Sequence, residues 1–201
     1  MSRNSPPSPR FNIALVLSIM CLTSSACANM KSAADLATKD RAVAETAAKE
    51  LRASAEAGDA SAQNRLGLLY DEGKGVPQNP IQAKEWFEKA AMQGHVGAQL
   101  NLGTLYLEGK GAPQSAQMAL VWFSRAAEQE DGLAFAKLGW MYEQGRGVLQ
   151  DFIQAYMWYN LGAARGEWKA ADARDALAKR MNPAQIADAQ RLAREWKPKG
   201  K

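Results

Sequence analysis

Apolar residues between about residue 47 and residue 196 recur at the spacing of amphipathic helices. From residue 60 to residue 72 they form one stripe at positions i, i+4, i+7 and i+8: Ala62, Leu66, Leu69 and Tyr70. A second run follows, again at helical spacing: Ala83, Trp86, Phe87, Ala90 and Ala91. The stretch between the two runs, DEGKGVPQ (71–78), is polar and rich in glycine. We therefore predict two helices joined by a turn.

Residues at the expected helix ends support this helical hairpin. Gly73 and Gly75 suit a helix C-terminus, where the backbone adopts a positive φ. Asn79 is a favoured N-cap for the second helix, and Pro80 fits its first position because the missing N–H costs nothing there. The equivalent positions further along carry two other favoured N-caps, Ser115 and Asp151.

The hairpin pattern repeats with a fixed period. LGLLYDEGKGVPQ (66–78) returns as LGTLYLEGKGAPQ (102–114) and as LGWMYEQGRGVLQ (138–150), an interval of 36 residues each time. A constant period between about 20 and 50 residues is typical of a solenoid. The sequence therefore predicts an all-α fold, an α-solenoid of stacked helical hairpins.

Each copy contains a glycine inside the apolar stripe of its first helix, at Gly67, Gly103 and Gly139. An exposed glycine within a helix costs about 1 kcal/mol relative to alanine, so a compensating gain is expected. We predict that these glycines allow a neighbouring helix to approach closely, and that Trp86 and its equivalents, Trp122 and Trp158, fill the space beside them.

The pattern AxxxLGxLYxxGxGVxxxxxxAxxWFxxAAxxG resembles the Sel1-like repeat, a relative of the tetratricopeptide repeat. Three full units match, at about 60–95, 96–131 and 132–167, within a predicted solenoid of residues 47–196. Residues 47–59 resemble a lone second helix that ends at Gly58, and residues 168–196 resemble a closing helical pair, with Asn182 capping a helix and Pro183 at its first position. Residues 197–201 form a basic tail.

One departure from the pattern concerns the turn into the third unit. Glu130 stands where the other units have Gly94 and Gly166. We expect Gly132, two residues later, to make this turn instead.

The first 28 residues have the organisation of a secretory leader. A polar stretch with two arginines precedes a 12-residue, mostly apolar run, FNIALVLSIMCL, and then the small residues TSSACA. Cleavage after Ala28 would leave Asn29 as the N-terminus; alternatively, Cys27 would be lipidated. We expect a periplasmic or secreted protein, or an envelope lipoprotein anchored at Cys27, with residues 29–46 as a tether. Contact with a membrane is expected only if Cys27 is lipidated.

Composition and chemistry argue against several functions. The formal net charge is +4, basic and acidic residues are interleaved, and Arg3 and Arg10 lie in the leader, so a nucleic-acid partner is not expected. His95 is the single histidine, and catalytic, phosphate-binding and metal-binding motifs are absent from the sequence. The GKG and GRG stretches sit at a helix end whose dipole repels phosphate. We predict no catalytic residues, no cofactor and no metal.

One stripe of the first helices is not copied between units. We predict that it binds a protein or peptide on the concave face of the solenoid, through these residues: Arg65, Leu68, Leu100, Asn101, Thr104, Leu107, Lys137 and Trp140. Alternatively, Leu100, Leu107 and Trp140 only pack against neighbouring units.

Two functions remain open from the sequence. The first is an exported protein-interaction scaffold, as the resemblance also implies, with a role in envelope signalling or assembly. The second is a hydrolase of cell-wall or β-lactam material, an activity suggested for some Sel1-like proteins. A deep pocket with converging carboxylates would favour the hydrolase, and a shallow groove would favour the scaffold. The sequence names neither the partner nor the oligomeric state.

Overall fold

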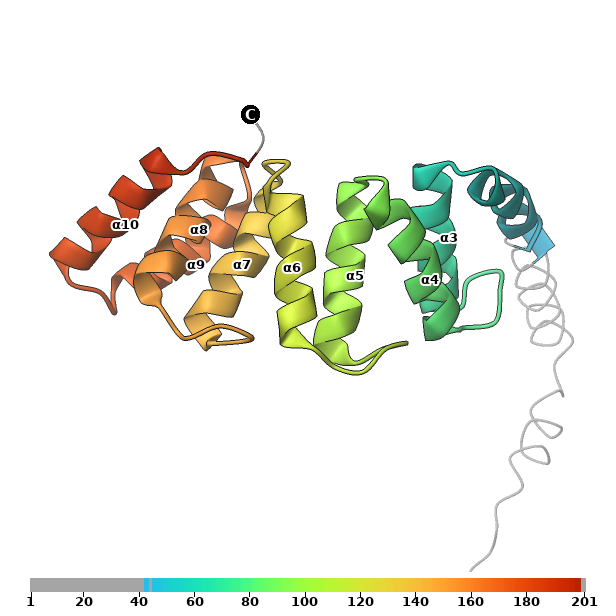
Figure 1. Cartoon of the computed structure of the whole chain (residues 1–201), viewed down its shortest axis with the longest axis horizontal. Helices are drawn as coiled ribbons and strands as arrows, with labels where there is room; N and C mark the ends of the chain where they lie inside the picture. Colours follow the sequence, from blue (N-terminus) through green and yellow to red (C-terminus); the bar gives the residue numbers. More distant parts are fainter. Residues whose placement is uncertain (1–41, 44, 200–201) are drawn as a thin grey trace, which may run out of the picture. The chain divides into compact units, whose positions relative to one another are not determined.

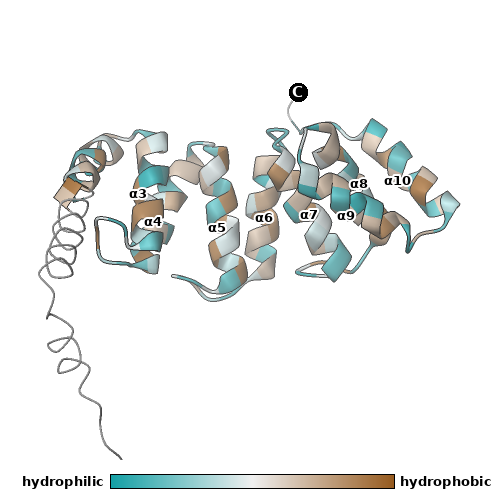
Figure 2. Ribbon diagram, turned by 180° about the vertical axis from the view of Figure 1, so that it is seen from behind, coloured by the Kyte–Doolittle hydropathy of each residue, from teal (hydrophilic) through white to brown (hydrophobic). Residues whose placement is uncertain are grey.

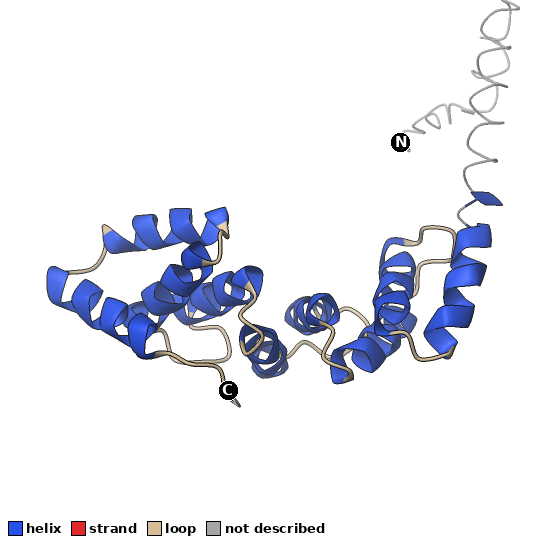
Figure 3. Ribbon diagram, turned by 90° about the horizontal axis from the view of Figure 1, so that it is seen from above, coloured by secondary structure: helices blue, strands red, loops and turns tan. Residues whose placement is uncertain are grey.

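The computed structural model describes residues 42–43 and 45–199. The predicted leader and most of the predicted tether lie outside these residues. Residues 45–199 belong to one compact unit. Its secondary structure is helical throughout, with no strand among the described residues (Figure 3). None of the helices in this part of the chain has the length and apolar character needed to cross a membrane.

The helices follow the predicted hairpins (Figure 1). After a helix at residues 45–56 come the three hairpins: α3 (Ala60–Glu72) with α4 (Pro80–Met92), α5 (Val96–Glu108) with α6 (Ala116–Ala127), and α7 (Gly132–Gln144) with α8 (Phe152–Ala164). Two further helices, α9 (Trp168–Ala178) and α10 (Pro183–Glu195), both pack on α8. Each helix from α3 to α8 packs on the next in the chain. The predicted all-α solenoid is confirmed.

The helix ends form as local sequence dictates. Asn79 accepts hydrogen bonds from the backbone N–H groups of Ile81 and Gln82, with Pro80 as the first helical residue. Gly73 is left-handed at φ 70° and ends α3. Asn182 and Gln185 form a reciprocal capping box at the start of α10. The other predicted caps, Ser115 and Asp151, are also confirmed.

The core glycines are Gly67, Gly103 and Gly139, one in the first helix of each unit. Each faces the aromatic residue that directly follows the predicted tryptophan. A Cβ atom on Gly67 would lie 2.6 Å from ring atoms of Phe87, and one on Gly103 would lie 2.5 Å from the Phe123 ring. The third glycine, Gly139, faces Tyr159 in the same way. The close approach of the two helices is therefore confirmed. The predicted pairing with the tryptophans is wrong by one residue, because adjacent helical residues point about 100° apart.

In the second and third units, the second glycine of the turn packs against the preceding unit. Gly111 has a φ of +68°, and a Cβ atom there would lie 2.1 Å from the carbonyl oxygen of Pro80 in the preceding unit. Gly147 lies in the same way against the backbone of Ala116. Because these two glycines have no side chain, each turn lies directly on the first residues of the second helix in the preceding unit, α4 or α6.

The turn into the third unit is made by Glu130 itself. Glu130 is left-handed at φ 62°, a conformation that costs a residue with a Cβ about 1–2 kcal/mol. Its carboxylate forms an ion pair with Arg165 at 2.5 Å, and Asp131 caps α7 by accepting from the N–H of Ala134. The expectation that Gly132 makes this turn is wrong, since Gly132 is the first residue of α7.

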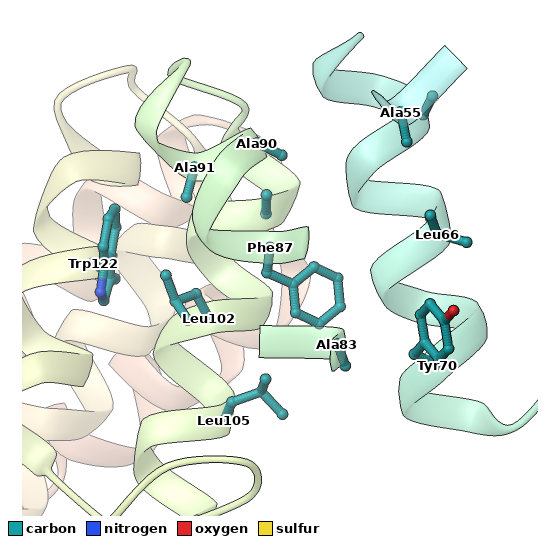
Figure 4. Close-up of a cluster of buried hydrophobic side chains, with 12 residues drawn as sticks. Ala55, Leu66, Tyr70, Ala83, Phe87, Ala90, Ala91, Leu102, Leu105 and Trp122 are labelled. Atoms are coloured by element: carbon teal, nitrogen blue, oxygen red, sulfur yellow. The ribbon is translucent and has the colours of Figure 1, made fainter. Parts of the chain in front are cut away.

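The first hydrophobic cluster spans the first two units. Phe87 extends from α4 toward α3, which carries Leu66 and Tyr70 (Figure 4). Trp122 belongs to the same cluster and lies beside Leu102. Figure 2 shows hydrophobic and hydrophilic residues mixed along each helix, as amphipathic packing requires.

A second hydrophobic cluster is formed by buried residues of α6 and α7, among them Phe123, Phe135 and Leu138, and Trp158 and Trp196 pack against it. Trp196, the residue after α10, packs edge-on against Phe135 with ring centroids 5.1 Å apart. Trp158 lies 5.8 Å from both rings. The aromatic contacts explain how the segment that follows α10 is held against α7 and α8.

Two buried glutamines link successive units. Gln99 donates from Nε2 to the carbonyl oxygen of Ala91 at 3.2 Å, and Gln129 donates to Gln99 Oε1 at 3.0 Å. Gln63 makes the same pair of contacts one unit earlier. In the third unit, Phe135 occupies the position that Gln63 and Gln99 hold in the first two units. The 36-residue spacing of Gln63 and Gln99 was the signal that could have revealed this network.

Candidate functional site

The first helices of the three units, α3, α5 and α7, carry all eight predicted binding residues. Two open hollows lie along them. The N-terminal hollow has a volume of about 610 Å³ and lies between the helix at residues 45–56, α3 and the turn after α3. Its main lining residues are Glu50, Leu51, Arg65, Leu68, Glu72 and Lys74. Two predicted residues, Arg65 and Leu68, lie here.

The C-terminal hollow has a volume of about 510 Å³ and is formed by α5, α7, α8, α9 and the turn after α7. Four predicted residues meet in it: Thr104, Leu107, Lys137 and Trp140. They come from two consecutive units, because the 36-residue repeat places the last two turns of α5 beside α7. The structure therefore brings together half of the predicted set at one place.

The remaining two predicted residues line neither hollow. Leu100 is half-buried and packs against the second hydrophobic cluster. Asn101 donates from Nδ2 to Asn64 Oδ1 at 3.0 Å, so its amide N–H group already has a partner in the preceding unit. The alternative for the apolar residues was that they only pack against neighbouring units. The structure supports this alternative for Leu100. Leu107 packs on the same cluster and also lines the C-terminal hollow.

The apolar part of the C-terminal hollow is partly open to solvent. Trp140 is 37% exposed and Leu133 is 39% exposed, and Ala136 lies between them on α7. Ala173 contributes from α9. Apolar residues that remain exposed while sharing one concave surface are characteristic of interaction sites.

Three basic side chains surround this apolar part: Lys137, Arg146 and Lys169. The guanidinium of Arg146 lies 5.9 Å from the centroid of the Trp140 ring, in cation–π geometry. Lys137 belongs to the predicted stripe. Arg146, in the turn, and Lys169, on α9, were missed by sequence reasoning, which considered only the first helices.

The carboxylates near the C-terminal hollow have basic partners of their own. Glu108 lines the hollow and pairs with Lys110 at 2.6 Å. Glu143 accepts hydrogen bonds from the Tyr159 hydroxyl at 2.9 Å and from Arg180 at 2.7 Å. Burial, and then the hydrogen bond to Glu143, raise the pKa of Tyr159 above its ordinary value. Tyr159 therefore remains a protonated hydrogen-bond donor in the wall of the hollow at neutral pH.

The single histidine has a structural role. His95 caps α5, its Nδ1 atom accepting a hydrogen bond from the N–H of Ala98 at 3.2 Å. Within residues 42–43 and 45–199, no group of three or more His, Cys, Asp or Glu side chains is arranged to hold a metal ion.

The geometry defines a helical-repeat protein whose first helices present two hollows of different lining. Three segments match the Sel1 repeat family, at residues 60–95, 96–131 and 134–167. The chain belongs to the Sel1 repeat family. Proteins built of these repeats are generally non-enzymatic scaffolds for protein–protein interaction.

Two solved structures support the assignment. A Sel1 repeat protein from Oxalobacter formigenes is 40% identical, with a TM-score of 0.60, over 63% of this chain and 52% of its own. A protective antigen present in uropathogenic Escherichia coli strains, which displays an SLR fold, is 30% identical, with a TM-score of 0.56, over 74% of this chain and 40% of its own. The chain thus spans about half or less of these proteins. No curated protein matches the sequence.

Proposed function

We propose that the protein is an exported scaffold that binds a segment of another protein on the face formed by its first helices. The observation that carries this proposal is the C-terminal hollow, where Leu107, Lys137 and Trp140 from two units meet in one open concavity. Binding through such a surface requires no catalytic group, cofactor or metal.

The contrast between framework and lining supports this function. The core glycines recur in every unit, and each faces an aromatic ring, while Gly111 and Gly147 lie against the backbone of the preceding unit. The position of Trp140, by contrast, holds Leu68 and Thr104 in the other two units. Repeat proteins keep the residues that stack the units and vary those that face a partner.

A hydrolase would need converging carboxylates, and no observation favours one. Among the residues that line the C-terminal hollow, Glu108 is the carboxylate, and it is paired with Lys110. The N-terminal hollow is lined by two carboxylates: Glu50, which is exposed, and Glu72, which pairs with Lys74 at 2.6 Å. We propose a non-enzymatic role for the chain on the strength of the surface that it presents.

The binding role is tested by truncating the central side chain of the hollow. Trp140→Ala should weaken capture of the partner from an envelope extract, since aromatic anchors in interfaces contribute about 2 kcal/mol or more each. The measurement is quantitative pull-down with the immobilised chain, comparing each captured protein between Trp140→Ala and the parent. Thermal melting should change little, because the side chain is 37% exposed.

Ile81→Ala is the matched control for this experiment. Ile81 is 59% exposed, lies on α4 and lines neither hollow. It should leave both capture and melting unchanged. A captured set that is identical for the parent, Trp140→Ala and Ile81→Ala would show that the hollow is not the binding surface.

Export is the second part of the proposal, and it rests on the leader pattern of residues 1–28. When the full chain is produced in a bacterial host, we expect cleavage near residues 26–28. Intact mass of the envelope fraction distinguishes the forms: a chain that begins at Asn29 indicates soluble export, and a lipidated Cys27 indicates an anchored protein. An uncleaved chain in the cytoplasm would contradict export in either form.

A further inference from the structure

The charge of the C-terminal hollow is unbalanced. Lys137, Arg146 and Lys169 line it, and none of these three forms an ion pair with a carboxylate in the described part of the chain. The hollow's own carboxylate, Glu108, is neutralised by Lys110. Three positive charges therefore line one concavity without a carboxylate partner in the described part of the chain. Two of them contact aromatic rings instead: Arg146 lies over Trp140, and the Lys169 ammonium lies 5.4 Å from the centroid of the Trp168 ring.

Comparison of the three turns shows how this imbalance arises. In the first two units the turn lysine pairs with the glutamate two residues before it, Lys74 with Glu72 and Lys110 with Glu108, each at 2.6 Å. In the third unit, Gln144 occupies the position that this glutamate holds in the first two units. Arg146 consequently has no carboxylate in its own turn and lies over Trp140 instead.

The same residues also provide an apolar contact surface. Trp140 and Leu133 are each more than a third exposed, and Leu107 from α5 and Ala173 from α9 also line the hollow. The volume of about 510 Å³ is within the range of small binding pockets. A ligand that fits must combine an apolar group with negative charge, because either alone would leave part of the lining unmatched.

We propose that the C-terminal hollow binds an acidic segment of a partner protein, with an apolar side chain between Leu133 and Trp140 and carboxylates beside it. This inference rests on the proposed function and names the chemistry of its partner. Arg146 is suited to hold a carboxylate bidentately, and Lys137 and Lys169 act as point charges on either side. The N-terminal hollow is different, since its turn lysine is already paired with Glu72.

The test is a selection that does not presuppose the partner. A displayed library of random 12-residue peptides is enriched on the immobilised chain, residues 29–201, and bound peptides are sequenced. We expect enrichment of sequences with two or more Asp or Glu residues next to a large apolar residue. Binding of the best peptide, measured by fluorescence anisotropy, should weaken as NaCl rises from about 50 to 300 mM, because exposed charges are screened.

Charge-reversal variants locate the site. Lys137→Glu with Lys169→Glu should weaken binding of the selected acidic peptide at least tenfold. The control is Lys49→Glu with Lys179→Glu, which makes the same change in net charge at exposed residues outside the hollow. It should change binding less than twofold. Far-UV circular dichroism and thermal melting confirm that both double variants remain folded.

The outcomes separate this inference from the proposed function. If the enriched peptides are neutral or basic and Trp140→Ala abolishes their binding, the hollow binds peptides but the acidic partner is wrong. If no peptide is enriched, or if Trp140→Ala binds the selected peptides as the parent does, both proposals fail. Two competitors test other anionic ligands: a single-stranded 20-nucleotide DNA and anionic phospholipid vesicles. If either displaces the acidic peptide and binds the hollow more tightly than the peptide does, the assignment to a protein segment is wrong.

Discussion

Gly111→Ala is expected to lower the free energy of unfolding by about 2–5 kcal/mol, the sum of a left-handed penalty and an overpacking penalty. The φ of +68° disfavours any side chain, and the new Cβ would lie 2.1 Å from the carbonyl oxygen of Pro80. That oxygen belongs to the backbone at the start of α4, so it cannot move aside without shifting a helix. Urea unfolding followed by far-UV circular dichroism measures the change.

Gly94→Ala is the matched control, because it separates conformation from contact. Gly94 also has a positive φ, +87°, but a Cβ atom there would have nothing within 4 Å. The expected loss is about 1–2 kcal/mol, from the left-handed backbone alone. Equal losses for Gly111→Ala and Gly94→Ala would contradict the close contact between the turn and the preceding unit.

Trp122→Ala is expected to destabilise the fold by about 3–5 kcal/mol, the usual cost of truncating a buried tryptophan. Trp122 is 7% exposed and packs with Leu102 and Leu105 in the first hydrophobic cluster. The Arg125 guanidinium, 4.5 Å from the ring centroid, covers the side chain. The variant should therefore unfold at a clearly lower urea concentration than the parent.

Two variants calibrate this result. Trp140→Ala removes a tryptophan that is 37% exposed and should cost much less stability. Trp122→Phe keeps an aromatic ring in the cluster and removes an indole N–H that has no hydrogen-bond partner among the described residues, so it should cost less than Trp122→Ala. If Trp140→Ala lowered the urea midpoint as much as Trp122→Ala, Trp140 would be a core residue and the proposed site would lose its central anchor. If Trp122→Ala unfolded at the same urea concentration as the parent, Trp122 would not be a core residue.

The proposed binding surface was only partly accessible to sequence reasoning. The stripe on the first helices led to Leu107, Lys137 and Trp140, since a helical period fixes which residues share a face. Arg146 and Lys169 could not be assigned in this way, because they come from a turn and from a closing helix. Their position beside Trp140 depends on how α7, α8 and α9 pack together.

The sequence by itself determined the helices, most of their ends and their repetition. These features are local: a cap such as Asn79 bonds within three residues, and the left-handed turn at Gly73 needs only a missing Cβ. The 36-residue period then implied stacking, because a single hairpin cannot bury its own apolar face. These properties were therefore predictable without any knowledge of contacts between units.

The tertiary structure alone decided which residues meet between helices. Gly67 contacts Phe87 rather than Trp86 because neighbouring residues on a helix point about 100° apart, and the rotation of α4 against α3 selects one of them. Glu130 is left-handed although glycine would be favoured, and it forms an ion pair with Arg165 at the C-terminal end of α8. The C-terminal hollow likewise forms only where two units and α9 meet. The residues that give it its shape and charge are up to 69 positions apart in the sequence, from Thr104 to Ala173.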